Sequence, residues 1–272
     1  MINESELLRT ALVGEVTSPV MGPNPYDVTA DGVPFVPVGA GGICYTVRVG
    51  MPACGWAADQ VEPGASIANP EAAANEALLA YACVGNRAVV ARTGAEGFVI
   101  GKHEAFQLYK HLLVHFDPEA LEELVPGDRV VVEACGRGLA LEGLACHSLG
   151  PELWLRWAPE RDGDRLRVRV TRVFPPEVVG MGSGRVSAVT SVALQHPPED
   201  LRIGDLVAIR DWDASYITGY HEDRVTVGVV TTGDSPVLGN GPATTILLSG
   251  PTAALDFAID PGANLAALFG IG

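Results

Sequence analysis

Basic residues are scarce in this chain. Only 18 lysines and arginines stand against 33 aspartates and glutamates, which gives a formal net charge of −15, and the only lysines are Lys102 and Lys110. Proteins that bind phosphate backbones need clustered Lys and Arg, and the chain has no basic run. The composition therefore argues against nucleic acid and against an anionic membrane as partners. It leaves open a basic pocket inside an acidic protein.

Cysteines and long apolar runs are also few. The chain has five cysteines, an odd number, and no C-x-x-C pair, which argues against a disulfide framework and against a thiolate zinc site. No apolar run approaches the ~20 residues that cross a bilayer. The first ten residues have neither the basic nor the apolar region of a signal peptide. We therefore expect a soluble, cytoplasmic protein.

Glycine and proline are abundant instead. The 32 glycines and 20 prolines are dispersed among short apolar runs, and 47% of the residues are hydrophobic. This pattern is typical of a globular, β-rich protein with many turns. We predict a mainly β fold (β-rich α+β) of two small-barrel-like units, residues 1–155 and 156–272, with two or three short helices. The clearest helix is predicted at about 70–84, a strand at 43–49, and a hairpin at 85–103 with strands at 87–92 and 97–101.

One short pattern occurs in both halves. The segments LVPGDRVVV (124–132) and LRIGDLVAI (201–209) share a Gly-Asp pair followed by alternating apolar residues. Gly-Asp forms a tight turn that can start a strand, and such strands are common in small barrels. The match covers nine residues, so it is weak evidence for duplication.

An acidic segment follows the second of these strands. RDWDASYITGYHED (210–223) lies between two apolar, strand-like runs and is longer than the 2–5 residues of an ordinary hairpin loop. If the strand continues to residue 213, alternation places the Asp211 and Asp213 carboxylates on one face. Such a pair can hold Mg²⁺, Mn²⁺ or Ca²⁺, so we predict a divalent metal ion there. The competing interpretation is a solvated acidic connection.

A second group of polar residues lies in ACGWAADQVEPGAS (53–66). Asp59 and Glu62 occupy a loop beside Trp56 and are candidates for general acid–base chemistry, because desolvation raises the pKa of a carboxyl group. On the residues alone, an acceptor of backbone N–H groups in a tight loop is the favoured role for either carboxylate.

The third group surrounds the two lysines, in GKHEAFQLYKHLLVH (101–115). Lys102 and His103 follow a predicted strand and could bind a carboxylate or polarise a carbonyl group, since lysine offers a flexible, titratable amine. His111 and His115 are four residues apart on a strand, so they share a face but stand too far apart to bind one ion easily. For each histidine alone, a surface or hydrogen-bonded role is the more common one.

Several motifs together resemble a known family. They are NPY at 24–26, G-x-G-G-I at 39–43, G-W-A-x-D-x-V-E-P-G at 55–64, C-x-G-N at 83–86, G-K-H at 101–103 and G-D-x-V-x-I-x-D-x-D at 204–213. They resemble the bacterial domain-of-unknown-function family 4438, over about residues 14–250. The resemblance implies a two-part, β-rich protein and no particular activity.

These observations support two hypotheses about function. The first is a small-molecule-binding protein or metal-assisted hydrolase with a polar cleft between its halves. Asp59, Glu62, Lys102 and His103 would be its catalytic residues, and Asp211 and Asp213 would bind the metal. Hydrolysis of an amide-like bond is the reaction to test first, because metal-bound water beside a base suits it. The second is a non-catalytic oligomeric binding or assembly module, since the apolar C-terminal segment could pack on a partner; we expect a homo-oligomer.

Overall fold

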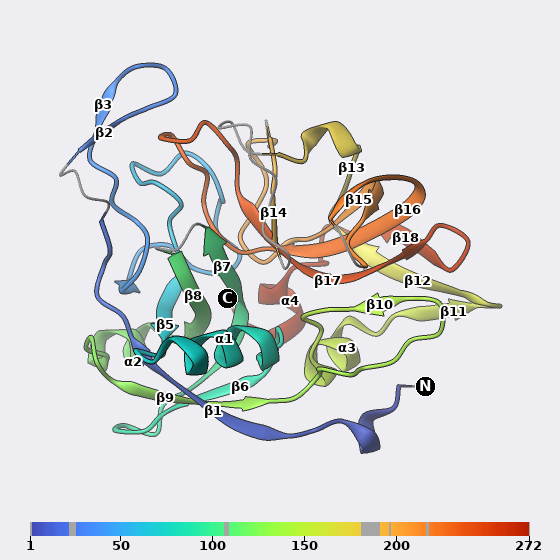
Figure 1. Cartoon of the computed structure of the whole chain (residues 1–272), viewed down its shortest axis with the longest axis horizontal. Helices are drawn as coiled ribbons and strands as arrows, with labels where there is room; N and C mark the ends of the chain where they lie inside the picture. Colours follow the sequence, from blue (N-terminus) through green and yellow to red (C-terminus); the bar gives the residue numbers. More distant parts are fainter. Residues whose placement is uncertain are drawn as a thin grey trace.

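The first half of the chain folds into a closed barrel of six antiparallel strands (Figure 1). The structure is a computed structural model that describes residues 2–21, 26–105, 109–180, 191–195, 197–215 and 218–271. Each barrel strand pairs with the next, and the first pairs with the last. In spatial order they are β1 (Thr10–Val16), β9 (Arg129–Ala134), β6 (Arg87–Val90), β7 (Glu96–Ala105), β8 (Tyr109–Phe116) and β5 (Gly64–Ala68).

Alternating side chains fill the barrel and cover its outside. On β9, Val130, Val132 and Ala134 are buried, whereas Arg129 and Glu133 are exposed, as a strand with one inward face requires. Two helices pack on the barrel. They are α1 (Ala72–Tyr81), whose cap Glu71 accepts hydrogen bonds from the N–H groups of residues 73 and 74, and α2 (Pro118–Glu123), where Asp117 stands at the cap position without a side-chain hydrogen bond to the helix.

The predicted strand at 43–49 is much shorter in the structure. Only β4 (Ile43–Cys44) pairs with β5, and the chain then turns, with Tyr45 56% exposed. The reason is that β1 already pairs with the far end of β5 to close the barrel, so β4 adds to the edge over two residues only. A second short pair, β2 (Asp27–Val28) and β3 (Pro34–Phe35), forms a separate hairpin that projects from the body (Figure 1).

The rest of the chain, from residue 145 onward, forms a six-stranded sheet, a three-stranded sheet and two more helices. In the six-stranded sheet, β10 (Ala145–Cys146), β17 (Ala243–Pro251), β16 (Gly219–Val230), β15 (Leu206–Asp213) and β13 (Arg172–Phe174) are neighbours in that order, and β14 (Ser191–Ala193) pairs with β17. The three-stranded sheet has the order β11 (Glu160–Asp162), β12 (Arg165–Val170) and β18 (Leu255–Ile259). The helices are α3 (Pro151–Trp157) and α4 (Leu265–Phe269), and two 3₁₀ turns span Glu4–Glu6 and Pro176–Val178.

The predicted fold class, a β-rich protein with a few short helices and small-barrel character, is confirmed. The closed barrel belongs to the first half; no pairing among the described strands of the second half closes them into a ring. The helix α3 spans the predicted boundary between residues 155 and 156, and it was not predicted. No helix of the described chain has the length and apolarity needed to cross a membrane.

The larger hydrophobic cluster joins the two halves. Ile100 and Leu113 lie on the outer face of β7 and β8 and belong to the same buried cluster as Val229 and Leu247 of the second sheet. The barrel interior is a separate cluster, with Val99 and Leu112 from the alternate positions of the same two strands. The outer face of β7 and β8 is therefore buried against the second half, and polar side chains on it are removed from water.

The repeated Gly-Asp pattern has the same local structure in both halves. Gly127 and Gly204 have φ of +91° and +86°, a conformation that glycine adopts at little cost. The following aspartates, Asp128 and Asp205, are buried and accept hydrogen bonds from the N–H groups of Val125 and Arg202. These turns start β9 and lead into β15, so the repeated sequence encodes a repeated turn.

Candidate functional site

The Glu62 carboxylate lies at the centre of a buried polar cluster on the outer face of the barrel. The side chain is 1% exposed, and Oε2 accepts hydrogen bonds from the Gly41 N–H (2.8 Å) and from the Ser66 hydroxyl. Gly41 has φ of +77°, and a Cβ there would lie 2.8 Å from the Ser18 carbonyl oxygen. The glycine-rich loop at 39–42 therefore brings a backbone donor close to the carboxylate, which a larger residue could not do.

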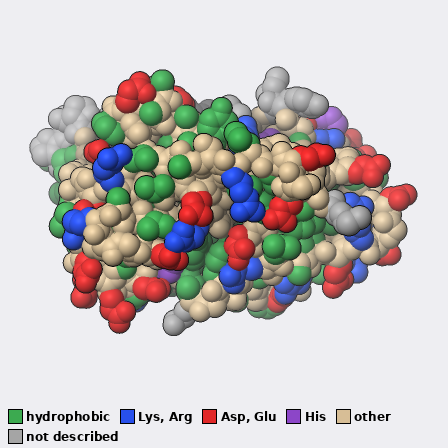
Figure 2. Space-filling view, turned by 90° about the horizontal axis from the view of Figure 1, so that it is seen from below, with side chains coloured by type: hydrophobic (Ala, Val, Ile, Leu, Met, Phe, Trp, Pro, Cys, Tyr) green, Lys and Arg blue, Asp and Glu red, His purple; other side chains and the backbone are tan. Residues whose placement is uncertain are grey.

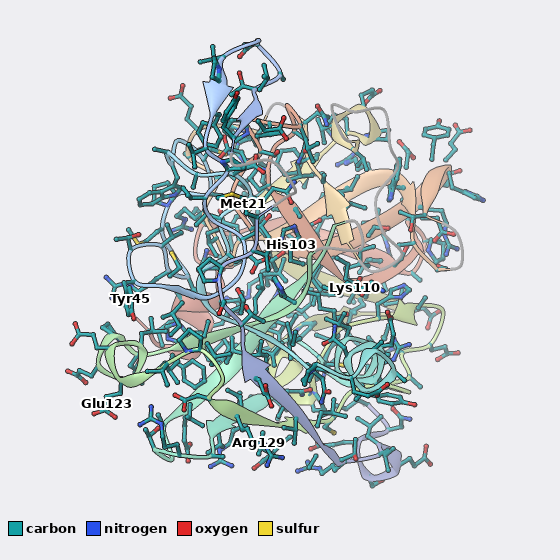
Figure 3. All side chains as sticks on the ribbon, turned by 60° about the vertical axis from the view of Figure 1, so that its left-hand side comes forward. Met21, Tyr45, His103, Lys110, Glu123 and Arg129 are labelled. Atoms are coloured by element: carbon teal, nitrogen blue, oxygen red, sulfur yellow. The ribbon has the colours of Figure 1, made fainter. Side chains whose placement is uncertain are left out.

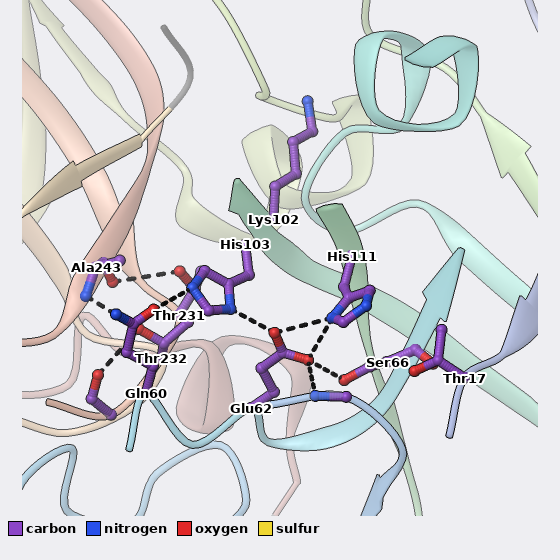
Figure 4. Close-up of polar contacts among 12 residues, drawn as sticks. Thr17, Gln60, Glu62, Ser66, Lys102, His103, His111, Thr231, Thr232 and Ala243 are labelled. Carbon is purple, nitrogen blue, oxygen red and sulfur yellow. Dashed lines mark hydrogen bonds and ion pairs between the residues drawn. The ribbon is translucent and has the colours of Figure 1, made fainter. Parts of the chain in front are cut away.

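Two histidines on neighbouring strands hold the same carboxylate between them. His103 on β7 and His111 on β8 are directly opposite each other in the antiparallel pair, so their side chains project from the same face. His103 Nδ1 contacts Glu62 Oε1, and His111 Nδ1 lies 3.0 and 2.9 Å from the two carboxylate oxygens. Figure 4 shows Glu62 between the two rings, and Figure 3 shows His103 in the interior, far from the peripheral Glu123 and Arg129.

Electrostatics favour the charged form of Glu62. Burial by itself raises the pKa of this carboxyl group, but the charge and hydrogen bond of His103, together with those of His111, outweigh burial and hold the pKa well below its ordinary value of 4.5. A buried carboxylate is stable only when it is paired and hydrogen-bonded. Glu62 meets that condition through four donors.

Both ring nitrogens of His103 face oxygen atoms. Nδ1 faces the Glu62 carboxylate, and Nε2 lies 2.6 Å from the Gln60 side-chain oxygen. With the Gln60 amide in this orientation both facing atoms are acceptors, and only a ring with a proton on each nitrogen can donate to both. The pair lies in a site that is almost removed from water, with His103 2% exposed.

The loop that carries Glu62 is held by the second half of the chain. Gln60 has φ of +49°, and its N–H donates to the Asp234 carbonyl oxygen at 2.7 Å. Asp59 Oδ1 accepts hydrogen bonds from the Ser235 hydroxyl (2.7 Å) and the Val237 N–H (3.2 Å). Burial nevertheless raises the pKa of Asp59, because these hydrogen bonds only partly offset it. Asp59 therefore lies beside the cluster and joins the two halves.

Lys102 lies on the opposite face of β7 from His103. The expected strand ended at residue 101, but β7 continues to Ala105, so successive side chains alternate between faces. Figure 4 shows the Lys102 side chain pointing away from the cluster. It is 1% exposed, and its Nζ lies 2.9 Å from the Ser148 hydroxyl oxygen. Burial lowers the pKa of this amine, and the nearby Cys83 and Glu104 counter the effect only in part.

Asp211 and Asp213 are also remote from the cluster and do not share a partner. The strand β15 reaches Asp213 as predicted, but it has a bulge at Asp211, where φ is +49°. Asp211 accepts a hydrogen bond from the Asp223 N–H. Asp213 accepts hydrogen bonds from Ser249 (3.0 Å) and Arg224 (2.9 Å).

The Asp213 carboxylate is already paired within the chain. Burial raises its pKa, but hydrogen bonds from Ser215, Arg224 and Ser249 outweigh this and lower the pKa to about 2. Over the described residues, no three His, Cys, Asp or Glu side chains are arranged to hold a metal ion. The metal role of Asp211 and Asp213 stays a prediction without geometric support.

The structure therefore brings together two of the predicted catalytic residues, Glu62 and His103, with Asp59 beside them. It adds Gln60, Ser66 and His111, which the sequence did not single out as site residues. The signal for His111 was available in principle, because the hairpin register pairs it with His103. Ser66 is only four residues from Glu62, but no residue pattern shows that the chain between them turns so that the two side chains meet.

The comparisons with known proteins place the chain in a family. Residues 26–154 match the family described as Domain of unknown function (DUF4438), N-terminal, and residues 156–269 match its C-terminal counterpart. The chain therefore belongs to the DUF4438 family, as the sequence motifs indicated. It is similar to the crystal structure of TM1086, with 32% identity, a TM-score of 0.90 and coverage of 98% of both chains. No curated protein matches the chain.

Proposed function

We propose that this protein is a small-molecule enzyme in which Glu62 and His103 move a proton. The observation that carries the proposal is the fully buried carboxylate held between two imidazole rings, with every contact supplied by side chains or N–H groups from separate segments. A carboxylate that orients and charges an imidazole is the arrangement that general acid–base catalysis uses. Perturbed ionisable groups of this kind cluster at functional sites.

The role of each residue follows from its contacts. Glu62 holds His103 by Nδ1 and stabilises its positive charge, which leaves Nε2 as the atom that gives or takes a proton when a substrate displaces Gln60. His111 and Ser66 keep the carboxylate oriented. Asp59 and Lys102, also predicted as catalytic, would act from beside and behind this pair. Cleavage of an amide-like bond suits an imidazolium that can protonate the leaving amine.

The experiment that tests the proposal needs no substrate. Nitrogen-15 NMR of labelled histidine should show the His103 ring protonated on both nitrogens in the wild-type protein and neutral in Glu62→Gln. A ring with the same neutral tautomer in both proteins would contradict the proposal. In an assay of small p-nitroanilides, His103→Gln should lower any turnover about 100-fold or more.

The projecting hairpin supports the alternative of a non-catalytic assembly module. It exposes a row of apolar side chains that extends beyond its two strands: Tyr26, Val28, Val33, Val36 and Val38, each 49–60% exposed. A two-stranded hairpin is marginally stable alone in water, so contact with a second copy would stabilise it.

The C-terminal segment, by contrast, packs on its own chain. The ring of Phe269 is stacked on that of Phe98, with 4.1 Å between the ring centroids. Analytical ultracentrifugation of the wild type and of the double variant Val28→Asp/Val36→Asp tests whether the hairpin holds copies together. A monomeric wild-type protein would exclude the assembly module.

The surface agrees with the proposed absence of nucleic acid and membrane partners. On the face in Figure 2, Lys and Arg side chains lie among Asp and Glu side chains and form no continuous basic patch. Arg87, for example, contacts both Glu96 and Glu133. Cations that are paired in this way are not available to bind phosphate groups.

A further inference from the structure

A pocket distinct from the Glu62 cluster lies between the barrel rim and the C-terminal segment. Its volume is about 790 Å³, within the range of pockets that hold small molecules. The first half contributes residues 48–51 and 115, 117 and 118, and the second half contributes residue 202 and parts of 261–271. The two parts approach closely at Gly50, where a Cβ would lie 3.1 Å from that of Ala266.

The charged side chains of this pocket are mainly basic, in a protein of net charge −15. Arg48 and Arg202 line it against a single acid, Asp117. Arg202 uses one nitrogen, Nη2, to contact Asp205 and the Pro261 carbonyl oxygen. Arg48 has neither an ion pair nor a side-chain hydrogen bond within the described part of the chain. A half-buried guanidinium without a partner is a ready donor for a carboxylate or phosphate group.

His115 supplies a second, independent indication of a ligand. This ring also lines the pocket and is 7% exposed, and its Nε2 has no hydrogen-bond partner among the described residues. The nearest acid is Asp117, whose Oδ1 lies 3.7 Å away, too far for a hydrogen bond. Buried polar atoms are almost always satisfied, so an orphaned ring nitrogen beside a free guanidinium marks a place for an acceptor from outside the chain.

Much of the rest of the lining is apolar. Val49, Met51, Ala266, Ala267 and Ile271 form the wall beside these polar groups. From this arrangement we propose that the pocket binds a small organic anion, whose carboxylate or phosphate group contacts Arg48 and His115 and whose apolar part lies against α4. This site does not depend on the proposed role of Glu62 and His103, from which it differs in every residue.

Four probes with the same six-carbon chain test the proposal by calorimetry on the whole protein. Hexanoate and hexyl phosphate carry the expected negative charge, whereas hexan-1-ol and hexylamine do not. One or both anions should bind in the millimolar range or tighter, and the neutral and cationic probes should bind at least tenfold more weakly. The stronger of the two anions identifies the head group. Equal binding of hexan-1-ol and the anions, or no binding of either anion, would overturn the proposal.

Variants locate the binding. Arg48→Met keeps an unbranched apolar stem and removes the charged guanidinium group, so it should weaken anion binding about tenfold or more. The matched control is Arg161→Met, at an exposed arginine on β11 that lines none of the pockets described. Ala267→Trp fills the pocket from its exposed wall without changing charge, and should also abolish binding. Melting temperatures check that each variant is folded. Undiminished binding by Arg48→Met and Ala267→Trp would refute the assignment.

Discussion

The two faces of β7 carry buried ionisable side chains in opposite circumstances. On the outer face, the Glu62 carboxylate contacts His103, and His111, Ser66 and Gly41 complete its hydrogen bonds. On the other face, the Lys102 amine is equally buried, but among the described residues its hydrogen bond is to the neutral Ser148 hydroxyl, and the nearby Cys83 and Glu104 offset burial only in part. The burial of Glu62 is therefore better compensated than that of Lys102.

This difference separates two reasons for burying charge. The contacts of Glu62 join segments of the first half, and the adjacent Asp59 and Gln60 form hydrogen bonds to the second half. The Lys102 amine forms no ion pair among the described residues, and a buried amine that is not paired with an acid destabilises the fold. Residues that cost stability in this way are typical of functional sites. The comparison therefore leaves Lys102 as a candidate for function even though it lies apart from His103.

The largest effect on stability is expected when the Glu62–His103 pair is broken. Glu62→Gln removes one partner of the buried Glu62–His103 pair, and we expect a loss of about 3–5 kcal/mol in the free energy of unfolding. Urea unfolding measures it. The control Glu122→Gln removes an exposed carboxylate and should change the free energy by less than about 0.5 kcal/mol. A loss near that of the control would show that Glu62 contributes little to the stability of the fold.

Removal of the Lys102 amine should change the free energy of unfolding in the opposite direction. Lys102→Met keeps the aliphatic stem and removes the amine, so we expect a gain of about 1–3 kcal/mol in the free energy of unfolding. The matched control is Lys110→Met, at the only other lysine, whose ion pair with Glu76 is partly exposed and is expected to contribute about 1 kcal/mol or less. A marked destabilisation by Lys102→Met would mean that the amine has a structural role.

The smallest effect is expected in the pH dependence of the free energy of unfolding, to which the ionisation of Glu62 contributes. The pKa of Glu62 is lowered in the folded protein, so below its ordinary value of 4.5 the unfolded chain binds the proton more readily. Its contribution to stability is fully present above pH 4.5 and is lost as the pH falls towards the folded pKa. Below pH 4.5, wild type should lose up to about 1.4 kcal/mol per pH unit more than Glu62→Gln. Parallel curves for the two proteins would argue against the lowered pKa.

Much of the fold followed from local patterns. The hairpin strands at 87–90 and 96–105, the helix at 72–81 and the two Gly-Asp turns were all anticipated within a few residues. A small error at one strand end had a large consequence: with β7 extending to Ala105, Lys102 and His103 point to opposite faces and cannot line one cleft. The division at residues 155 and 156 stays a proposal, because the larger hydrophobic cluster includes residues from both sides of it.

Composition and periodicity by themselves determined a β-rich, acidic protein and the kinds of side chain available for chemistry, because alternation, glycine turns and net charge are local or additive properties. The family was indicated by the resemblance of several short motifs. Only the tertiary structure decided that Glu62 meets His103 and His111, that Asp213 is already paired with Arg224, and that Arg48 and His115 share a pocket. Those contacts depend on barrel closure and on the packing of the second half against β7 and β8, and both arise from interactions between residues far apart in the chain.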